Sequence, residues 1–315
     1  MEHAPTTQGI FIGKVVRQSS PCDHHFSCTL EVHSFPQATP GQFMQIQCRP
    51  PSVTVQPCEM GEGRLVSIAG APPAIGPREA FLRRPLSIAG LRRTGDQCEV
   101  DLLGRVTGNG TAWLADRRVG DLVNFIGPLG RGFSTPSQGT RALLVAGGVG
   151  LPPIRWLGEN LRKMGVTCSA VYGARTRELM PVKLLREPSR EGEMAACIEE
   201  FSREGIDAVI TTDDGTCGMK GHVVDAVRRY FDTVDASAVL VYACGPEPML
   251  RSLGAFCVDR GLPCEVALER MMACGMGTCQ SCVVRVVDKT VASEWRYALA
   301  CTEGPVFDAA KLVWE

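Results

Sequence analysis

Residues 142–153, ALLVAGGVGLPP, decide the fold of this chain. The stretch begins with an apolar run of strand length, turns through a glycine-rich segment and then opens a helical pattern that continues to residue 164. The glycines of the turn are Gly147, Gly148 and Gly150, and Pro152 follows them. A dinucleotide phosphate loop requires this order, because its backbone must approach the phosphates closely and the helix start attracts negative charge. The spacing differs from GxGxxG, so the surrounding chain has to decide the interpretation.

Downstream of this stretch, strand-like and helix-like patterns alternate. Strands are expected over 167–173, 208–212 and 238–245, and helices over 222–231 and 248–261. Such alternation predicts a Rossmann-like parallel sheet with helices on both faces, and ligands bind such sheets where the strands end. We therefore expect a nucleotide crevice formed by the glycine turn together with Arg175, Asp213, Asp214, Cys244 and Gly245. The alternative is a set of ordinary tight turns.

Upstream, about 135 residues rich in Gly and Pro hold short alternating apolar segments, which are typical of an antiparallel β-barrel. One of them, RRPLSIAG, places Arg84 and Ser87 on an expected strand. There the guanidinium can bind a pyrophosphate and the hydroxyl can hydrogen-bond a flavin ring. A similar segment, RLVSIAG, carries Arg64 and Ser67 twenty residues earlier. The later copy is preferred because Pro85 fixes its backbone and a hairpin turn follows it directly.

A second feature of the barrel region is GNGTAWLAD, which places Gly110 and Thr111 just before an expected short helix. Backbone N–H groups and the helix dipole can hold a phosphate at such a point. The alternative is an ordinary N-capped turn.

Near the C-terminus four cysteines follow the spacing CxxxxCxxC and then a lone cysteine; they are Cys274, Cys279, Cys282 and Cys301. This spacing is the plant-type pattern of [2Fe-2S] ligands. Gly275 and Gly277 lie in the first gap and allow the backbone to curl so that its N–H groups point at sulfur. A structural zinc site is the alternative, although zinc usually draws on paired CxxC units. The last gap, between Cys282 and Cys301, has 18 residues.

The composition limits the possible functions. With 315 residues, 44% hydrophobic content and a net charge of -1, the chain suits two or three globular units and does not indicate nucleic acid as a partner. No apolar run approaches the ~18 residues of a membrane span, and the first ten residues lack signal-peptide features. Fifteen cysteines without a regular framework argue for reduced thiols, so no membrane partner and a cytoplasmic location are expected.

A possible metal group near the start of the chain consists of Cys22, His24, His25 and Cys28. Its spacing matches no regular zinc pattern. The segment 26–33 also alternates as a half-buried strand, with Cys28 and Leu30 on the buried face. A strand is therefore the preferred interpretation.

Taken in order, these motifs resemble one family. RRPLSI, AGGVGLPP, YGAR, TTDDG, ACGPEPM and ERMMACGMGTCQSCVV, followed by CTEGPVF, are similar to the electron transfer subunits of NAD-dependent dihydroorotate dehydrogenase B, within the ferredoxin reductase-like superfamily. The resemblance covers nearly the whole chain and implies an α+β multidomain fold. Its units would be an FAD-binding β-barrel over 1–138 with an insertion near 49–79, an NAD-binding α/β domain over 139–262 and a small [2Fe-2S] domain over 263–315.

The resemblance also implies cofactor contacts. FAD would meet Arg84, Pro85, Leu86, Ser87, Gly110 and Thr111; NAD(H) would meet the glycine turn; and the four cysteines would hold the [2Fe-2S] cluster. Leu86 stands where many relatives have an aromatic residue. The chain shows no site for an organic acid, so no catalytic residue is assigned. The family implies an FMN-containing dihydroorotate dehydrogenase catalytic subunit as partner, in a heterotetramer with two of each, serving pyrimidine biosynthesis.

Two alternatives remain open. The first is the reductase subunit of another complex, such as a ferredoxin:NADP oxidoreductase, sulfide dehydrogenase or hydrogenase module, and Arg175 and Arg177 could bind the 2′-phosphate of NADP. The second is a non-catalytic scaffold with a structural zinc. Iron with acid-labile sulfide would separate the first from the second.

Overall fold

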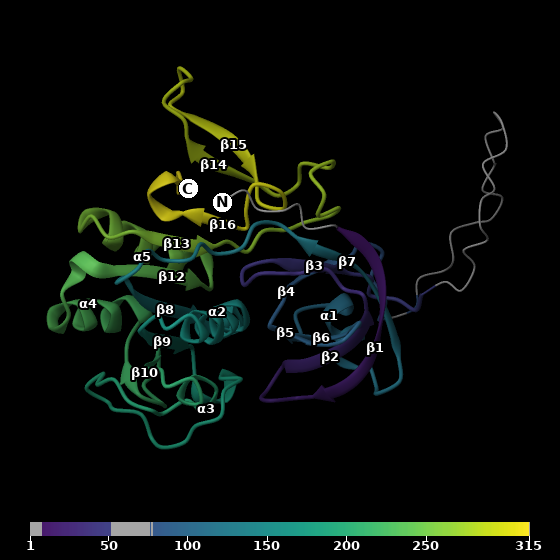
Figure 1. The fold of residues 1–315 in the computed structure, drawn as a ribbon, viewed down its shortest axis with the longest axis horizontal. Coiled ribbons are helices and arrows are strands. Elements are labelled where there is room, and N and C mark those ends of the chain that lie inside the picture. The colour runs from purple at the N-terminus through teal and green to yellow at the C-terminus, as the bar shows by residue number, and fades with distance from the viewer. Residues whose placement is uncertain (1–7, 52–75, 77, 315) are drawn as a thin grey trace.

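The computed structural model describes residues 8–51, 76 and 78–314. Most of the Pro-rich stretch 49–79, including Arg64 and Ser67, lies outside these residues. Figure 1 shows the described chain as a barrel, an α/β unit beside it and a cysteine-bearing segment that lies over both. No helix in the described residues is long and apolar enough to cross a membrane.

The barrel is one curved antiparallel sheet with the strand order β4-β3-β7-β1-β2-β6-β5. Its elements are β1 (Gly9–Ser19), β2 (His25–His33), β3 (Phe43–Ile46), β4 (Arg84–Ser87), β5 (Gly90–Thr94), β6 (Gln97–Arg105), α1 (Asn109–Ala115) and β7 (Leu122–Leu129). The alternation of the sequence decides which side chains enter the core, because successive residues of a strand face opposite sides. Cys28, Leu30 and Val32 of β2 are buried, as are Val100 and Leu102 of the neighbouring β6. The predicted strand over 26–33 and its buried face are confirmed.

The α/β unit contains a second sheet with the order β11-β10-β9-β8-β12-β13-β16. Its elements are β8 (Arg141–Gly147), α2 (Leu151–Lys163), β9 (Cys168–Ala174), α3 (Glu199–Ser202), β10 (Asp207–Thr212), β11 (Met219–Lys220), α4 (Val223–Thr233), β12 (Val239–Cys244), α5 (Glu247–Asp259), β13 (Cys264–Ala267) and β16 (Val306–Asp308). The chain proceeds from β8 to β9 and β10 on one side, and β12 then returns to the other side of β8. The strand order therefore reverses between β8 and β12, which is where open α/β sheets bind ligands.

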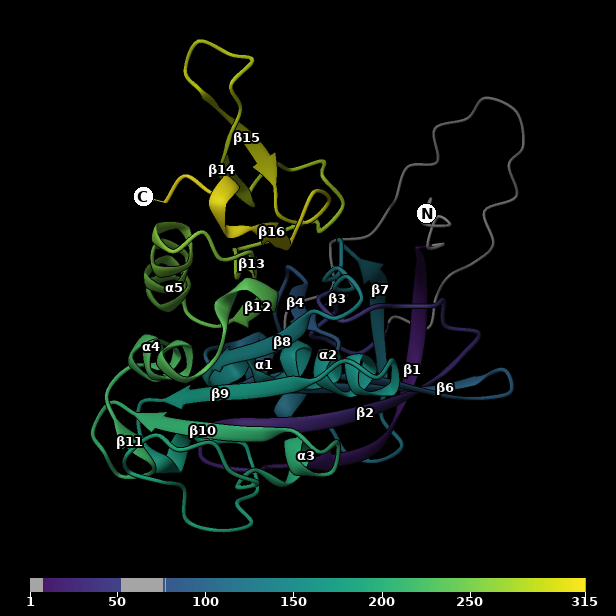
Figure 2. The same ribbon diagram turned by 60° about the vertical axis from the view of Figure 1, so that its left-hand side comes forward.

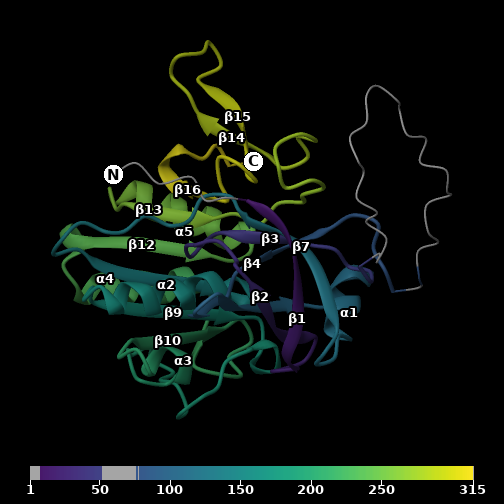
Figure 3. The same cartoon turned by 45° about the vertical axis from the view of Figure 1, so that its right-hand side comes forward.

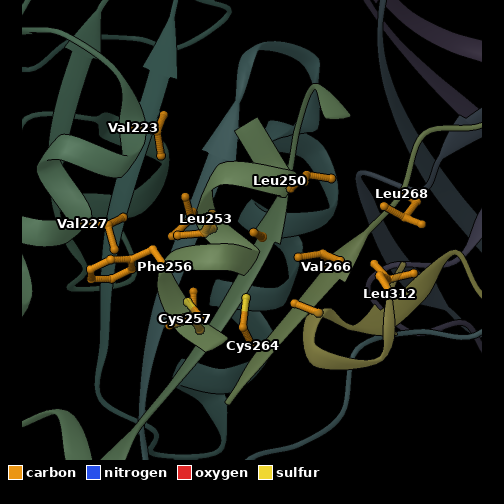
Figure 4. Close-up of a cluster of buried hydrophobic side chains, with 14 of the residues drawn as sticks. Val223, Val227, Leu250, Leu253, Phe256, Cys257, Cys264, Val266, Leu268 and Leu312 are labelled. Carbon is orange, nitrogen blue, oxygen red and sulfur yellow. The ribbon is translucent and has the colours of Figure 1, made fainter. Parts of the chain in front are cut away.

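Both faces of this sheet are apolar, as the continuous hydrophobic run in β8 predicts. Leu143 and Val145 pack with α4 and α5, whereas Leu144 faces the core formed with α2 and α3. Figure 4 shows the first of these cores, in which Phe256 and Cys257 of α5 lie close to the sheet. The predicted three-layer arrangement is confirmed.

The cysteine-bearing segment is inserted into this second sheet. β13 pairs with β12 and β16 pairs with β13, so residues 264–267 and 306–308 belong to the α/β sheet. Between them the chain forms a hairpin of β14 (Val283–Val287) and β15 (Trp295–Leu299), which projects from the molecule in Figure 2. The hairpin accounts for the 18-residue gap after Cys282, because antiparallel pairing of Val283 with Leu299 returns the chain to its starting point.

Helix α2 joins the α/β unit to the barrel. Trp156 of α2 is 4% exposed and packs in the barrel core, although the rest of that helix packs on its own sheet. The preceding residue, Arg155, donates a hydrogen bond of 3.1 Å to the carbonyl of Ala89, just beyond β4. On the other side, Glu247 at the start of α5 forms a bidentate ion pair with Arg270 of the cysteine-bearing segment.

We expect Trp156→Ala to separate the barrel from the α/β unit. Loss of a buried tryptophan side chain costs about 3–5 kcal/mol, and here the cavity opens at the joint between the units. Scanning calorimetry of the cofactor-loaded chain should show an earlier transition for the barrel. Met164→Ala, at the exposed end of the same helix, should change stability by no more than about 0.5 kcal/mol. Equal melting of the two variants would contradict this role.

Candidate functional site

The predicted flavin residues form one surface at the edge of the barrel. Arg84, Pro85, Leu86 and Ser87 make up the whole of β4, which pairs with β3. A Cβ atom placed on Gly110 would lie 3.0 Å from Cγ and 3.2 Å from Nε of Arg84. The structure therefore brings the strand arginine and the start of α1 together, and the absence of a side chain at Gly110 makes the contact possible.

The position of Thr111 differs from the sequence expectation. Helix α1 begins at Asn109, so Gly110 and Thr111 lie in its first turn instead of before it. The reason is that the preceding Gly108 has no capping side chain, and the Thr111 hydroxyl accepts hydrogen bonds from the backbone N–H of Thr107 at 2.9 Å and of Gly108 at 3.2 Å. Thr111 thus shapes the turn through its hydroxyl.

The nucleotide loop lies at the reversal point between β8 and β12. A Cβ on Gly150 would lie 2.2 Å from the carbonyl oxygen of Cys244, and one on Gly245 would lie 3.1 Å from Cα of Gly147. The two loops are therefore packed backbone against backbone, and the Met249 side chain lies against both, since a Cβ on Gly147 would lie 2.5 Å from its Sδ and one on Gly245 would lie 2.5 Å from its Cε. Burial raises the pKa of the Cys244 thiol to about 12, so this thiol stays protonated at neutral pH.

Arg175 and Asp213 lie together at the same edge, beyond β9 and β10. The N–H of Asp213 donates to the carbonyl of Ala174 at 3.2 Å. Oδ1 of Asp213 lies 3.3 Å from Nδ1 of His222. Arg175 is exposed, whereas Arg177 is held by Glu187 in a bidentate ion pair at 2.8 and 3.1 Å. The Arg177 guanidinium is thereby directed to a carboxylate of its own chain.

A hollow of about 650 Å³ lies elsewhere, at the amino ends of β12 and β13, where Val258, Cys264 and Lys311 line it. Ligands of open α/β sheets bind at the carboxyl ends of the strands. This hollow therefore does not belong to the nucleotide site.

The first two cysteines lie in a loop whose shape depends on glycine. Gly275 and Gly277 adopt φ angles of 76° and 86°, a conformation that L side chains rarely adopt. The loop directs the N–H groups of Met276 and Cys279 at Sγ of Cys274, at 3.3 and 3.5 Å. Such N–H donors to sulfur are what a cluster thiolate needs.

The other two cysteines stand at the base of the β14–β15 hairpin. The N–H of Ala300 donates to the carbonyl of Cys282 at 3.0 Å, so Cys301 is held beside Cys282. Both are 2% exposed, and burial together with the adjacent Cys282 thiol raises the pKa of Cys301 to about 12. Cys279 is exposed, and hydrogen bonds from Ser281 lower its pKa to about 6.

The four thiols are drawn together as two pairs, Cys274 with Cys279 and Cys282 with Cys301. Within the described ranges, no three His, Cys, Asp or Glu side chains converge closely enough to hold one metal ion. The donor set, four thiols with N–H donors and no carboxylate or imidazole, fits an iron–sulfur cluster.

The possible metal group near the start of the chain is divided between two places. Cys22 Sγ lies 3.2 Å from Nδ1 of His25, whereas Cys28 points into the barrel core.

Sequence reasoning missed three residues of the site. Ser281 Oγ lies 3.2 Å from Sγ of Cys279, and the half-buried Arg83 donates to Oδ1 of Asn124 at 2.6 Å and to the carbonyl of Gln45 at 3.2 Å. The Gln45 side chain, wholly buried on β3, touches the cluster loop at Gly275. Ser281 lies within the cysteine motif, and this position could have identified it. No pattern in the sequence identifies Arg83 or Gln45 as residues of the site.

Fold and site together define an oxidoreductase that combines a ferredoxin reductase-like barrel, an NAD-binding sheet and an iron–sulfur segment. Residues 269–313 match the iron-sulfur cluster binding domain of dihydroorotate dehydrogenase B, and residues 144–254 match the oxidoreductase NAD-binding domain. A solved NADH-dependent reduced ferredoxin–NADP oxidoreductase structure has a TM-score of 0.69 at 23% identity, over 100% of this chain and 92% of that chain. A ferredoxin reductase of carbazole 1,9a-dioxygenase has a TM-score of 0.59 at 17% identity, over 81% and 67%. These structures share the fold.

Curated relatives specify the family. A dihydroorotate dehydrogenase B (NAD(+)) electron transfer subunit from Desulforamulus reducens is 32% identical over 278 residues, 88% of each chain. The subunit of the same name from Geobacillus thermodenitrificans is 38% identical over 75% of this chain and 81% of its own. The chain belongs to the family of dihydroorotate dehydrogenase B electron transfer subunits, and the resemblance read from its motifs is confirmed.

We expect Gly150→Ala to weaken NADH binding. A methyl group there meets the Cys244 carbonyl at 2.2 Å, so the two loops must move apart. Steady-state kinetics with an artificial acceptor should show KM for NADH raised by roughly tenfold or more, equivalent to about 1.4 kcal/mol. Gly139→Ala, at a positive φ with open space around it, should cost stability but leave KM unchanged. An unchanged KM in Gly150→Ala would show that the loops are not part of the NADH site.

We expect Cys301→Ala to abolish the cluster while FAD remains, because the flavin residues lie on another unit. Iron and acid-labile sulfide should fall toward zero, and NADH-dependent reduction of an acceptor that takes electrons from flavin should persist. Cys98→Ala, at a buried barrel cysteine, serves as the matched control and should keep its iron. Full iron content in Cys301→Ala would remove this residue from the ligand set.

Proposed function

We propose that the chain is the electron transfer subunit of an NAD-dependent dihydroorotate dehydrogenase and carries electrons between NAD(H) and an FMN-containing catalytic subunit in pyrimidine biosynthesis. The observation that carries this proposal is that segment 269–313 is joined to the sheet that bears the nucleotide loop, because it follows β13 directly and its own strand β16 pairs with β13. The cofactors are FAD, NAD(H) and a [2Fe-2S] cluster. When bound, FAD exchanges a hydride with NAD(H) and gives electrons singly to a [2Fe-2S] cluster.

The chain contributes binding and positioning. Arg84 and the first turn of α1 would hold the FAD pyrophosphate, since the guanidinium and the backbone of Gly110 are adjacent. Pro85, Leu86, Ser87 and Thr111 would complete the flavin contacts. The hydrogen bond from Arg155 to Ala89 keeps the end of the flavin strand fixed against the helix that follows the nucleotide loop.

NAD(H) would lie across the β8–β12 reversal point. Gly147, Gly148, Gly150 and Gly245 form the two loops that would receive the phosphates, with open space beside Gly148, and the protonated Cys244 packs at the strand end. Arg175 and Asp213 lie where the far end of the dinucleotide would extend. Arg175 and Arg177 would favour NADP by binding its 2′-phosphate, but Arg177 is already paired with the carboxylate of Glu187. We therefore propose NAD(H) as the preferred nucleotide.

Cys274, Cys279, Cys282 and Cys301 would hold the cluster, and the partner would cover its exposed side. Met271 is 88% exposed and Met276 is 50% exposed on the same loop as Cys279, and exposed apolar side chains of this kind mark an interaction surface. We place the catalytic subunit there, with two copies of each subunit in the complex. Among the described residues all fourteen cysteines are free thiols, which suits the reducing conditions of the cytoplasm.

The test is purification of the tagged chain from its native cell, with a visible spectrum taken before and after NADH. We expect flavin and cluster absorbance that bleach with NADH, an FMN protein that co-purifies, and dihydroorotate-dependent reduction of NAD by the complex. A chain without flavin absorbance and without acceptor reduction would contradict the reductase assignment. A chain that reduces acceptors but neither co-purifies with nor activates a dihydroorotate dehydrogenase would contradict the pathway alone.

A further inference from the structure

Gln45 lies between the predicted flavin strand and the cluster loop. It belongs to β3, where it stands directly opposite Pro85 of β4. Its strand neighbours Met44 and Ile46 enter the barrel core, whereas Phe43 packs on the other side with residues of the α/β and cysteine-bearing units. Because side chains alternate along a strand, Gln45 shares the side of Phe43 and faces away from the barrel core. In Figures 1 and 3 the cysteine-bearing segment lies over this end of β3 and β7.

The amide of Gln45 is buried without a hydrogen-bond partner. The residue is 0% exposed, and neither Nε2 nor Oε1 has a partner among the described residues. Leaving a buried polar group unsatisfied costs about 1–3 kcal/mol, so a leucine of similar size would suit an ordinary core position better. The nearby Gln42 shows the usual arrangement: its Oε1 accepts from the N–H of Thr39 at 2.9 Å, and its Nε2 donates to the carbonyl of Gly130 at 2.8 Å.

The amide is aimed at the cluster loop. A Cβ on Gly275 would lie 2.5 Å from Cγ and 2.9 Å from Nε2 of Gln45, so the carboxamide lies directly against the backbone that follows Cys274. The same loop directs the N–H groups of Met276 and Cys279 at Sγ of Cys274. The backbone of Gln45 is fixed as well, because its carbonyl accepts from Arg83.

We propose that the Gln45 carboxamide is a positioning residue for the cluster: its N–H group donates a hydrogen bond to a sulfur of the cluster site and raises the reduction potential of the cluster. Hydrogen bonds to sulfur stabilise the reduced, more negative form and thus tune the potential. The inference rests on the proposed assignment of the four cysteines to a [2Fe-2S] cluster. It gives the buried amide a partner and joins the strand beside the flavin residues to the cluster loop.

The first test is an EPR-monitored redox titration of the purified chain with its FAD and cluster. Gln45→Leu should shift the one-electron equilibrium of the cluster toward the oxidised form by about tenfold, which is 59 mV lower in potential, and leave the flavin potential unchanged. The control Gln42→Leu removes a satisfied buried amide and should reduce stability without moving the potential.

The outcomes separate the possible roles. The proposal would be overturned if the one-electron equilibrium constant of the cluster changed less than twofold in Gln45→Leu, or if only the flavin potential shifted. Absence of iron from the unmodified chain would instead contradict the proposed function.

A second measurement begins with the unmodified chain, so its first result does not depend on whether a variant assembles. Pulsed EPR of the reduced, unmodified chain, carrying ¹⁵N in glutamine side-chain amides, should show a ¹⁵N coupling to the cluster. Gln280 also lies in the cysteine loop, so Gln280→Asn should keep this coupling if Gln45 is its source. Loss of the coupling in Gln280→Asn, or its absence from the unmodified chain, overturns the assignment to Gln45.

Discussion

One apolar core joins all three units, and the rest of the arrangement depends on it. Phe43 and Leu129 of the barrel pack in the same cluster as Val145 of the α/β sheet and as Cys282 and Cys301 of the cluster segment. A core that crosses unit boundaries resists relative motion, because close-packed interiors deform little. Electron transfer between fixed cofactors needs this rigidity, since binding and orientation are what the protein supplies. Polar contacts at the edge of this core, such as the ion pair of Glu247 with Arg270, then need only to set the orientation of one unit against the next.

Much of this could be predicted from the sequence because local patterns carried it. The apolar run 142–146 and the strand 84–87 are formed where they were expected, and the glycine turn lies at the reversal of strand order. The return of the chain to β13 and β16 could not be predicted in the same way. Strands of three or four residues have too little periodicity, and their pairing is decided by tertiary contacts. The hairpin after Cys282 has alternation, but only the structure shows that it brings Cys301 back.

Gln45 shows in physical terms why a residue of the site can escape prediction. Gln45 lies in FMQIQC, where the alternation places Gln45 and Gln47 on the same side of the strand, and a polar residue on a barrel strand normally faces water. Its burial depends on a segment 230 residues away in the chain, at Gly275. Thr111 illustrates the opposite case, because it was expected to lie before the helix beside a phosphate, and it lies in the first turn with its hydroxyl engaged with the residues that precede the helix. Local sequence identifies residue types that can bind, while the tertiary environment decides which atoms are free to do so.

The four thiols differ in a way that gives the cluster segment a direction. Cys282 and Cys301 are buried in the core shared with the barrel, and burial raises the pKa of Cys301 to about 12. Cys279 is exposed beside Met276, and the Ser281 hydroxyl lowers its pKa to about 6. A buried, poorly solvated side disfavours added negative charge, whereas an exposed side with hydrogen-bond donors stabilises it. The segment therefore turns its exposed thiol, Cys279, to the outside, and its buried thiols, Cys282 and Cys301, lie in the core that it shares with the barrel.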